Sequence, residues 1–296
     1  MAAQRAKMNV APFDALACPL DGSPLRREGS TWRCPVGHSH DIARQGHVHL
    51  LPVQQKRSRD PGDSREMVAA RRRFLNSGAY GPIAAAVSRA ALAKVPAATA
   101  VSCLDAGCGE GYYLRRLAAA GSDGPGLALI GIDISRWAVA AAATQDRRPR
   151  WVVASNANLP VQSGTLDCVL CLFGFPVHAE FARVLKPGGL LLQADAGDDH
   201  LRELREIIYP SLKPRRGAVA GAVEGFVALP GETVRYSLDL RDSQSIADLL
   251  AMTPHLYRAS ATRRAQLGKL TALSVTVDVR LAQLRRDASG CERAIS

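Results

Sequence analysis

Five apolar runs alternate with segments of helical pattern through the middle of this chain. The runs cover residues 101–105, 127–133, 151–154, 166–173 and 190–193. A strand that is apolar along its whole length is buried on both faces, which is typical of a parallel sheet with helices packed on either side. The alternation therefore predicts an α/β fold built on a mostly parallel, Rossmann-like sheet.

The segments before and after this region carry two further patterns. Ser64 and the apolar residues after it predict a capped helix that ends at Gly78, followed by a second helix over 82–94. Residues 234–240 and 275–281 alternate apolar and polar side chains on either side of a helix over 243–251. Alternation with period two is typical of half-buried strands, so we expect antiparallel strands at one edge of the sheet.

Charge is distributed unevenly along the chain. The sequence has 38 Lys and Arg against 27 Asp and Glu, a net charge of +11, and residues 1–73 alone hold 13 basic and 7 acidic residues. A basic excess favours association with a polyanion. Residues 1–55 are too few to build a core, so they need a metal or a neighbouring domain to hold them. We therefore divide the chain into a small module (1–55), a basic linker with helices (56–97) and the α/β domain (98–296).

A glycine-rich turn follows the first apolar run, within Leu104-Asp105-Ala106-Gly107-Cys108-Gly109-Glu110-Gly111. Glycines at the end of a buried strand let the backbone approach a ligand, and the helix that follows offers free N–H groups. The spacing differs from the dinucleotide fingerprint Gly-x-Gly-x-x-Gly. It resembles motif I of class I S-adenosylmethionine-dependent methyltransferases. Asp133, which ends the second run, is placed to accept hydrogen bonds from a ribose.

Two Cys-Pro segments near the N-terminus resemble the paired turns of a zinc ribbon, Cys18-Pro19-Leu20-Asp21 and Cys34-Pro35-Val36-Gly37-His38. Such turns supply four tetrahedral ligands, here Cys18, Asp21, Cys34 and His38. Asp21 stands where a second cysteine is usual, and a carboxylate is a harder ligand than a thiolate. His40, His47 and His49 are alternative ligands. The competing interpretation is a degenerate ribbon that packing alone holds together.

Longer stretches of the sequence resemble the 23S ribosomal RNA guanine-N1 methyltransferases. The resemblance rests on the two cysteine segments, on 41–53, on the charged run 56–64, on 70–75 and on 107–113 and 252–254. It implies a zinc-ribbon-like RNA-binding module at 1–55 and a methyltransferase domain at 98–296. It also implies zinc and S-adenosylmethionine as cofactors, and 23S rRNA as partner, with a homodimer as a further expectation.

The family's activity is transfer of a methyl group to N1 of one guanine in a stem-loop of 23S rRNA domain II. The run 56–63 resembles the branch that acts on the guanine typical of Gram-negative-type enzymes, whereas a sister branch modifies a nearby guanine and confers macrolide resistance. The cofactor contacts carry over to Tyr80, Gly109, Glu110 and His200; with the glycine motif this gives Tyr80, Asp105, Gly107, Gly109, Glu110, Gly111, Asp133 and His200. The RNA-binding residues expected are Lys56, Arg57, Arg59, Arg71 and Arg72.

N1 of guanine carries a proton at neutral pH, so a base near the ends of the fourth and fifth strands is expected to accept it. Asp195 and His178 are the leading candidates, with Asp198 and His200 beside them. Two other functions stay open: a small-molecule methyltransferase, which leaves the basic module unused, and an RNA-binding protein without catalysis, which leaves the glycine turn unexplained. No secretory signal or membrane span is predicted, so we expect a cytoplasmic protein.

Overall fold

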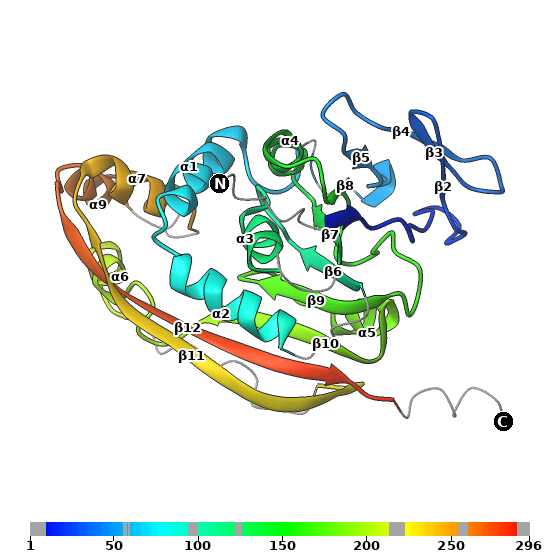
Figure 1. The fold of residues 1–296 in the computed structure, drawn as a ribbon. Helices are drawn as coiled ribbons and strands as arrows, with labels where there is room; N and C mark the ends of the chain where they lie inside the picture. Colours follow the sequence, from blue (N-terminus) through cyan, green and yellow to red (C-terminus); the bar gives the residue numbers. More distant parts are fainter. Residues whose placement is uncertain are drawn as a thin grey trace, which may run out of the picture.

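A nine-stranded sheet forms the centre of the computed structural model, which describes residues 10–55, 58, 60–93, 100–121, 126–212, 223–253 and 260–288. In chain order its strands are β1 (Val10–Pro12), β5 (Val48–His49), β6 (Val101–Ala106), β7 (Leu127–Asp133), β8 (Arg150–Val153), β9 (Leu166–Leu172), β10 (Leu185–Ala196), β11 (Phe226–Leu240) and β12 (Leu273–Arg286). The order across the sheet is β11-β12-β10-β9-β6-β7-β8-β5, and β1 pairs with β7 (Figure 1).

The five predicted apolar runs are the parallel strands β6 to β10, which confirms the mostly parallel sheet. The fifth strand is longer than predicted. Residues 186–189 lie inside it, at a register shift between Leu185 and Leu190 in its pairing with β9. Gly188 at φ +78° permits this irregularity, because the left-handed region favours glycine.

Helices cover both faces of the sheet. They are α1 (Arg65–Asn76), α2 (Gly81–Leu92), α3 (Tyr112–Ala120), α4 (Arg136–Gln145), α5 (His178–Val184), α6 (Arg202–Ile208), α7 (Ser243–Ala251) and α9 (Ala261–Leu267). Side chains of α1 to α4, α6, α7 and α9 join one buried cluster, and α5 joins the cluster on the opposite face. The predicted cap is present, since the Ser64 hydroxyl accepts the N–H of Met67 at 3.3 Å. None of the described helices is long and apolar enough to cross a membrane.

The predicted edge strands form a long antiparallel hairpin. β11 pairs with β12 from Phe226↔Arg286 to Leu240↔Leu273, and β12 pairs antiparallel with β10. The hairpin sweeps along one side of the molecule and carries α7 and α9 at its far end (Figure 1). Its inner residues, among them Val275, Val277 and Val279, are buried as the alternation predicts.

The N-terminal segment is divided between two sheets. β2 (Arg26–Glu28), β3 (Thr31–Arg33) and β4 (Ser39–Asp41) form a small sheet of their own, followed later by the 3-10 turn η1 (Val53–Gln55). β1 and β5, in contrast, pair with β7 and β8 of the central sheet. Phe13, Leu16 and Trp32 are buried in one cluster with strand residues such as Ile130. The segment therefore uses the core of the neighbouring domain, as its small size led us to expect.

Candidate active site

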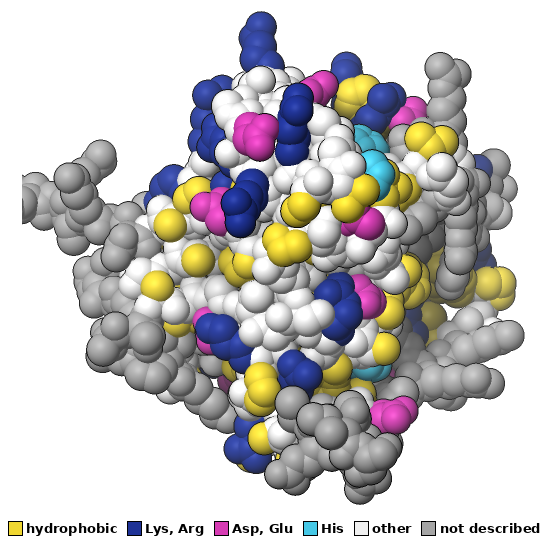
Figure 2. Space-filling model, turned by 90° about the vertical axis from the view of Figure 1, so that its right-hand side faces the viewer, with side chains coloured by type: hydrophobic (Ala, Val, Ile, Leu, Met, Phe, Trp, Pro, Cys, Tyr) yellow, Lys and Arg dark blue, Asp and Glu magenta, His cyan; other side chains and the backbone are white. Residues whose placement is uncertain are grey.

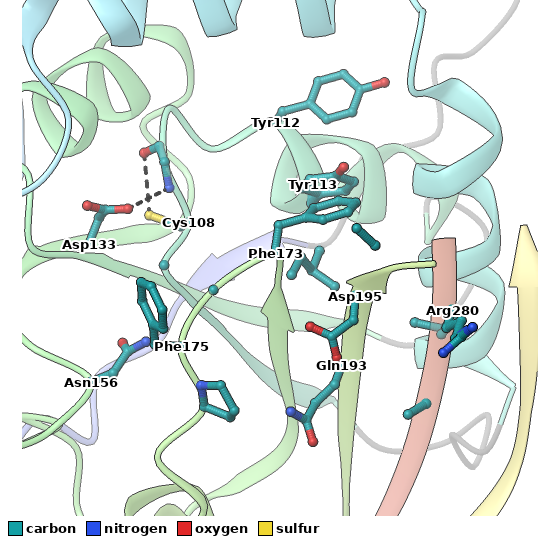
Figure 3. Close-up of a pocket in the computed structure, with 18 of the residues that line it drawn as sticks. Cys108, Tyr112, Tyr113, Asp133, Asn156, Phe173, Phe175, Gln193, Asp195 and Arg280 are labelled. Atoms are coloured by element: carbon teal, nitrogen blue, oxygen red, sulfur yellow. Dashed lines mark hydrogen bonds between the residues drawn. The ribbon is translucent and has the colours of Figure 1, made fainter. Parts of the chain in front are cut away.

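One large cleft opens at the carboxyl ends of the parallel strands, where ligands bind in open α/β sheets. Its volume is about 1790 Å³. The predicted residues that line it are Tyr80, Gly107, Gly109, Glu110, Asp133, His178, Asp195 and His200, together with Arg71. Figure 3 shows the glycine turn at one end and polar side chains of β10 and β12 at the other.

The glycine turn has the open backbone that the sequence predicts. Gly107, Gly109 and Gly111 have φ values of 92°, 55° and 83°, a region that side chains with a Cβ rarely adopt. The N–H groups of Gly107 and Cys108 both donate to the carbonyl of Ile132, at 2.8 and 3.0 Å. A Cβ at Gly111 would come within 2.5 Å of the Trp151 ring, so the turn is also packed closely from behind.

Two acids stand next to this turn. One Asp133 oxygen accepts the N–H of Gly109 at 2.9 Å, and the other accepts the N–H of Ser135 at 2.8 Å. Burial raises the pKa of Asp133, while these two bonds act in the opposite direction. Asp105 is fully buried and neither of its oxygens has a hydrogen-bond partner in the described residues. Burial, with a smaller effect of the Asp133 charge, raises the pKa of Asp105 to about 8.

The carboxylate of Glu110 is used within the protein. It forms an ion pair with Arg115 at 2.8 Å and accepts the side-chain amide of Gln145. The Glu110 side chain is fully buried, and its ion pair with Arg115 of α3 holds the start of that helix in place. A cofactor contact by Glu110 stays a prediction.

Aromatic side chains close the cleft beside the turn. The Tyr80 hydroxyl lies 3.4 Å from Nε2 of His200, and the Phe173 ring stacks on the His200 ring at 6.1 Å between centroids. Nδ1 of His200 accepts the N–H of Asp278 at 3.2 Å. Phe173 has φ +56°, a strained value of the kind that concentrates at functional sites.

The polar end of the cleft contains both leading catalytic candidates. Nε2 of His178 donates to the side-chain oxygen of Gln193 at 3.1 Å. Asp195 lies two residues further along β10, on the same face as Gln193, and burial raises its pKa. In the part of the chain that the structure describes, its carboxylate has no hydrogen-bond or ion-pair partner. Asp198 is exposed and pairs with Arg280 at 2.7 Å.

Of the predicted RNA-binding residues, the structure describes only Arg71 and Arg72. Lys56, Arg57 and Arg59 lie outside the described residues. Arg72 is exposed on α1, whereas Arg71 lies in the cleft, with an ion pair to Asp63 at 2.8 Å. Figure 2 shows the side of the molecule that carries the N-terminal segment, where the coloured basic side chains are scattered among acidic and hydrophobic ones.

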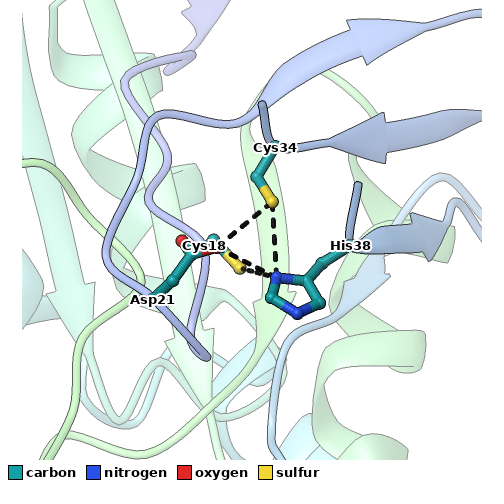
Figure 4. Close-up of side chains that lie close together, drawn as sticks. All are labelled: Cys18, Asp21, Cys34 and His38. Atoms are coloured by element: carbon teal, nitrogen blue, oxygen red, sulfur yellow. Dashed lines mark hydrogen bonds and ion pairs between the residues drawn. The ribbon is translucent and has the colours of Figure 1, made fainter. Parts of the chain in front are cut away.

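The four predicted metal ligands lie together on two loops (Figure 4). Their ligand atoms are all within 4.8 Å of one another. Nδ1 of His38 is 3.5 Å from Sγ of Cys18, 3.4 Å from Sγ of Cys34 and 3.0 Å from the Asp21 carboxylate. The Cys34 sulfur is 3.3 Å from the same carboxylate.

These separations fit the edges of a zinc tetrahedron. With zinc bonds of roughly 2.3 Å to sulfur and 2.0–2.2 Å to nitrogen and oxygen, tetrahedral angles place neighbouring ligand atoms about 3.3–3.8 Å apart, and the His38–Asp21 separation of 3.0 Å is slightly shorter. The donor set of two sulfurs, one imidazole and one carboxylate is one that zinc accepts. Of the alternative ligands, His40 and His47 are not in this cluster and each keeps one ring nitrogen buried without a partner in the described residues.

Several residues that line the cleft were not predicted. Among them are Asn156, Phe173, Phe175, Gln193 and Arg280. Arg71, which was expected to bind RNA, was not expected in the cleft. Phe175 is 90% exposed on the loop that follows β9. Its position just after the fourth apolar run could have indicated that it lies at the cleft, because the cleft opens at the ends of these strands. Arg280 belongs to the polar face of an alternating strand, and only the pairing of β12 with β10 shows that this face meets the cleft.

Comparison with known proteins gives two matching families. The family described as "RlmA, N-terminal", a zinc ribbon, matches residues 16–59, and a methyltransferase domain family matches residues 103–189. YxjB of Bacillus subtilis (strain 168), whose name assigns it as a 23S rRNA (guanine-N(1)-)-methyltransferase, is 33% identical over 90% of this chain and 95% of its own length. The 23S rRNA (guanine(748)-N(1))-methyltransferase of Streptomyces fradiae is 34% identical over 89% of this chain and 95% of its own. At this identity and coverage, the chain belongs to the family of 23S rRNA (guanine-N1)-methyltransferases.

Proposed function

We propose that this protein transfers a methyl group from S-adenosylmethionine to N1 of one guanine in a stem-loop of 23S rRNA domain II. The observation that carries the proposal is the single cleft that joins the glycine turn to the polar end around Asp195. Family membership and the zinc-type cluster support an RNA substrate over a small molecule. A non-catalytic RNA-binding protein would have no use for the cleft.

The residues of the cleft fit the cofactor. Bound S-adenosylmethionine supplies an electrophilic methyl group on a positively charged sulfur. The glycine turn offers close backbone approach, and Asp133 remains able to accept from a ribose, since each of its oxygens uses one backbone N–H. Tyr80 and His200 line the same cleft beside the turn, with the Tyr80 hydroxyl 3.4 Å from Nε2 of His200.

Among the four candidate bases we favour Asp195. His200 uses Nδ1 to accept a backbone N–H, and Asp198 is exposed and paired with Arg280. His178 is anchored to Gln193 through Nε2. Asp195 alone combines a place in the cleft with a carboxylate that no described residue binds, and its raised pKa suits a proton acceptor.

The N-terminal module is proposed to hold zinc through Cys18, Asp21, Cys34 and His38. It is also proposed to dock the RNA, together with Lys56, Arg57, Arg59, Arg71 and Arg72. Since ribosomal RNA is the substrate, we place the enzyme in the cytoplasm. The homodimer stays a prediction, which light scattering of the purified protein tests.

The decisive test uses 23S rRNA from a strain that lacks this protein. N1-methylguanine blocks the Watson–Crick edge, so reverse transcription stops there. Adding the purified protein and S-adenosylmethionine is expected to create one stop, at one guanine of domain II. Its position distinguishes the guanine named for the Streptomyces fradiae relative from the neighbouring guanine. If no new stop appears anywhere in 23S rRNA, the proposed function is wrong.

A further inference from the structure

A row of polar side chains crosses three strands at the end of the cleft remote from the glycine turn. Asp195 on β10 is the direct antiparallel partner of Arg280 on β12, and Arg280 is in turn the partner of Thr233 on β11. All three line the cleft. Directly opposite residues of antiparallel strands point to the same face, so the row is one surface. Figure 3 shows Asp195 and Arg280 on neighbouring strands at this end.

The two charges of the row do not neutralise each other. Arg280 is paired with Asp198, at 2.7 Å, and forms no ion pair with Asp195. Had Arg280 paired with Asp195, the positive charge would stabilise the carboxylate and weaken it as a base. Asp198 therefore holds the guanidinium while the Asp195 carboxylate stays open to the cleft, half-buried and without a described partner.

The remaining ionisable groups at this end are also engaged. His178 at the start of α5 donates to Gln193, and Glu232 on β11 is bound by Arg89 at 2.9 Å. This part of the cleft therefore offers a ligand one open acceptor, the Asp195 carboxylate, next to one oriented donor, the Arg280 guanidinium.

We propose that Asp195 and Arg280 recognise the Watson–Crick edge of the target guanine. The Asp195 carboxylate accepts the hydrogens on N1 and on the 2-amino group, and the Arg280 guanidinium donates to O6. Guanine presents two donors and one acceptor along this edge, which matches a carboxylate beside a guanidinium. Adenine presents an amino group where guanine has O6 and no hydrogen on N1, so it opposes donor to donor and leaves the carboxylate unsatisfied. This inference rests on the proposed function.

The same pair accounts for the proton in the reaction. As the bond from N1 to the methyl carbon forms and the carbon–sulfur bond breaks, its electron pair stays on sulfur and the N1 proton passes to Asp195. To the extent that the proton leaves before the bond to the methyl carbon is complete, negative charge develops on N1 and O6, where the Arg280 guanidinium stabilises it. Since N1 lies on the pairing edge, the guanine has to leave its base pair or lie unpaired in the loop to reach Asp195.

The test compares Asp195→Asn, Arg280→Gln and the control Arg285→Gln, which removes an exposed charge from the same strand outside the cleft. The substrate is the domain II stem-loop, with guanosine or with inosine, which lacks the 2-amino group, at the target position. Asp195→Asn is expected to lower kcat at least about 100-fold, Arg280→Gln to lower kcat/KM about 10–100-fold, and the control to change neither. Calorimetric affinity for S-adenosylmethionine should stay within about twofold in all three, which shows that each variant folds.

Two readouts separate recognition by Asp195 from a structural role. In the wild type, kcat falls as the pH drops through the Asp195 pKa, and this acid limb should vanish in Asp195→Asn but persist in Arg280→Gln. The wild type should prefer guanosine over inosine about tenfold, and Asp195→Asn should lose that preference. An Asp195→Asn enzyme that keeps both the acid limb and the preference overturns the inference. A wild-type enzyme that methylates no guanine N1 instead overturns the proposed function.

Discussion

At the glycine turn the two oxygens of Asp133 accept the backbone N–H groups of Gly109 and Ser135, whereas in the N-terminal cluster the ligand atoms of four side chains lie within 4.8 Å of one another. The turn is fixed by strands β6 and β7, which pair over six residues. The cluster joins two loops and a small three-stranded sheet. The glycine turn is therefore shaped by the strands that carry it, while the cluster joins a carboxylate, an imidazole and two cysteine sulfurs, a donor set that bound zinc would hold together.

The largest effect is expected when the metal is removed from the N-terminal cluster. Removing zinc with a chelator should abolish protection of the amides of β2, β3 and β4 against hydrogen exchange, because structural zinc contributes roughly 10 kcal/mol or more to small ribbons. Affinity for S-adenosylmethionine should change less than about threefold, since the turn has its own support. Metal analysis of the purified protein should first give one zinc per chain. A protein without zinc but with protected strands would show that packing holds the ribbon.

Much of this architecture followed from the sequence because it depends on local pattern. Continuous apolar runs marked the parallel strands, and alternation marked β11 and β12. The spacing of Cys18, Asp21, Cys34 and His38 singled out residues that the fold does bring together. Sequence could not show that β1 and β5 join the central sheet, because two- and three-residue strands carry no period. Nor could it place Arg280, whose meeting with Asp195 depends on pairing across 85 residues of chain.

A second prediction concerns Asp105, the buried acid behind the glycine turn. Its pKa in the folded protein is about 8, above the value of about 3.9 in the unfolded chain. Its contribution to stability is therefore complete below pH 4 and is lost as the pH rises through about 8. The wild type should lose roughly 3.5 kcal/mol of unfolding free energy between pH 5 and pH 8 from this group.

The Asp105→Asn protein lacks this titration, so its denaturant unfolding curves should depend less on pH. Its stability relative to the wild type should improve steadily from pH 5 to pH 8. Equal pH dependence in the two proteins would mean that Asp105 is ionised in the folded state and has a partner there.

A third prediction tests the backbone bonds themselves. Asp133→Ala leaves the N–H groups of Gly109 and Ser135 without their acceptor and removes the predicted ribose contact. Loss of two charge-assisted bonds from the ribose hydroxyls, of about 1.5 kcal/mol each, should weaken S-adenosylmethionine binding about 100-fold, measured by calorimetry, with RNA binding unchanged. The matched control is Asp167→Ala. Asp167 also accepts a backbone N–H, from Ser102 at 2.9 Å, but at the opposite ends of the strands. If the control weakens binding equally, the effect is general destabilisation.

The smallest effect is expected for RNA binding when basic residues next to the N-terminal module are removed. Replacing Lys56, Arg57 and Arg59 by Ala removes three cations next to the N-terminal module, so the slope of log affinity against log salt should flatten by about 2–3. The control replaces Arg241, Arg264 and Lys269, three exposed cations on and around α7 and α9 at the far end of the molecule (Figure 1). Net charge falls equally in both triple variants. If RNA binds through the overall charge, their slopes will agree; if it binds through the N-terminal module and linker, only the first slope will flatten, because counterions are released only where phosphates are contacted.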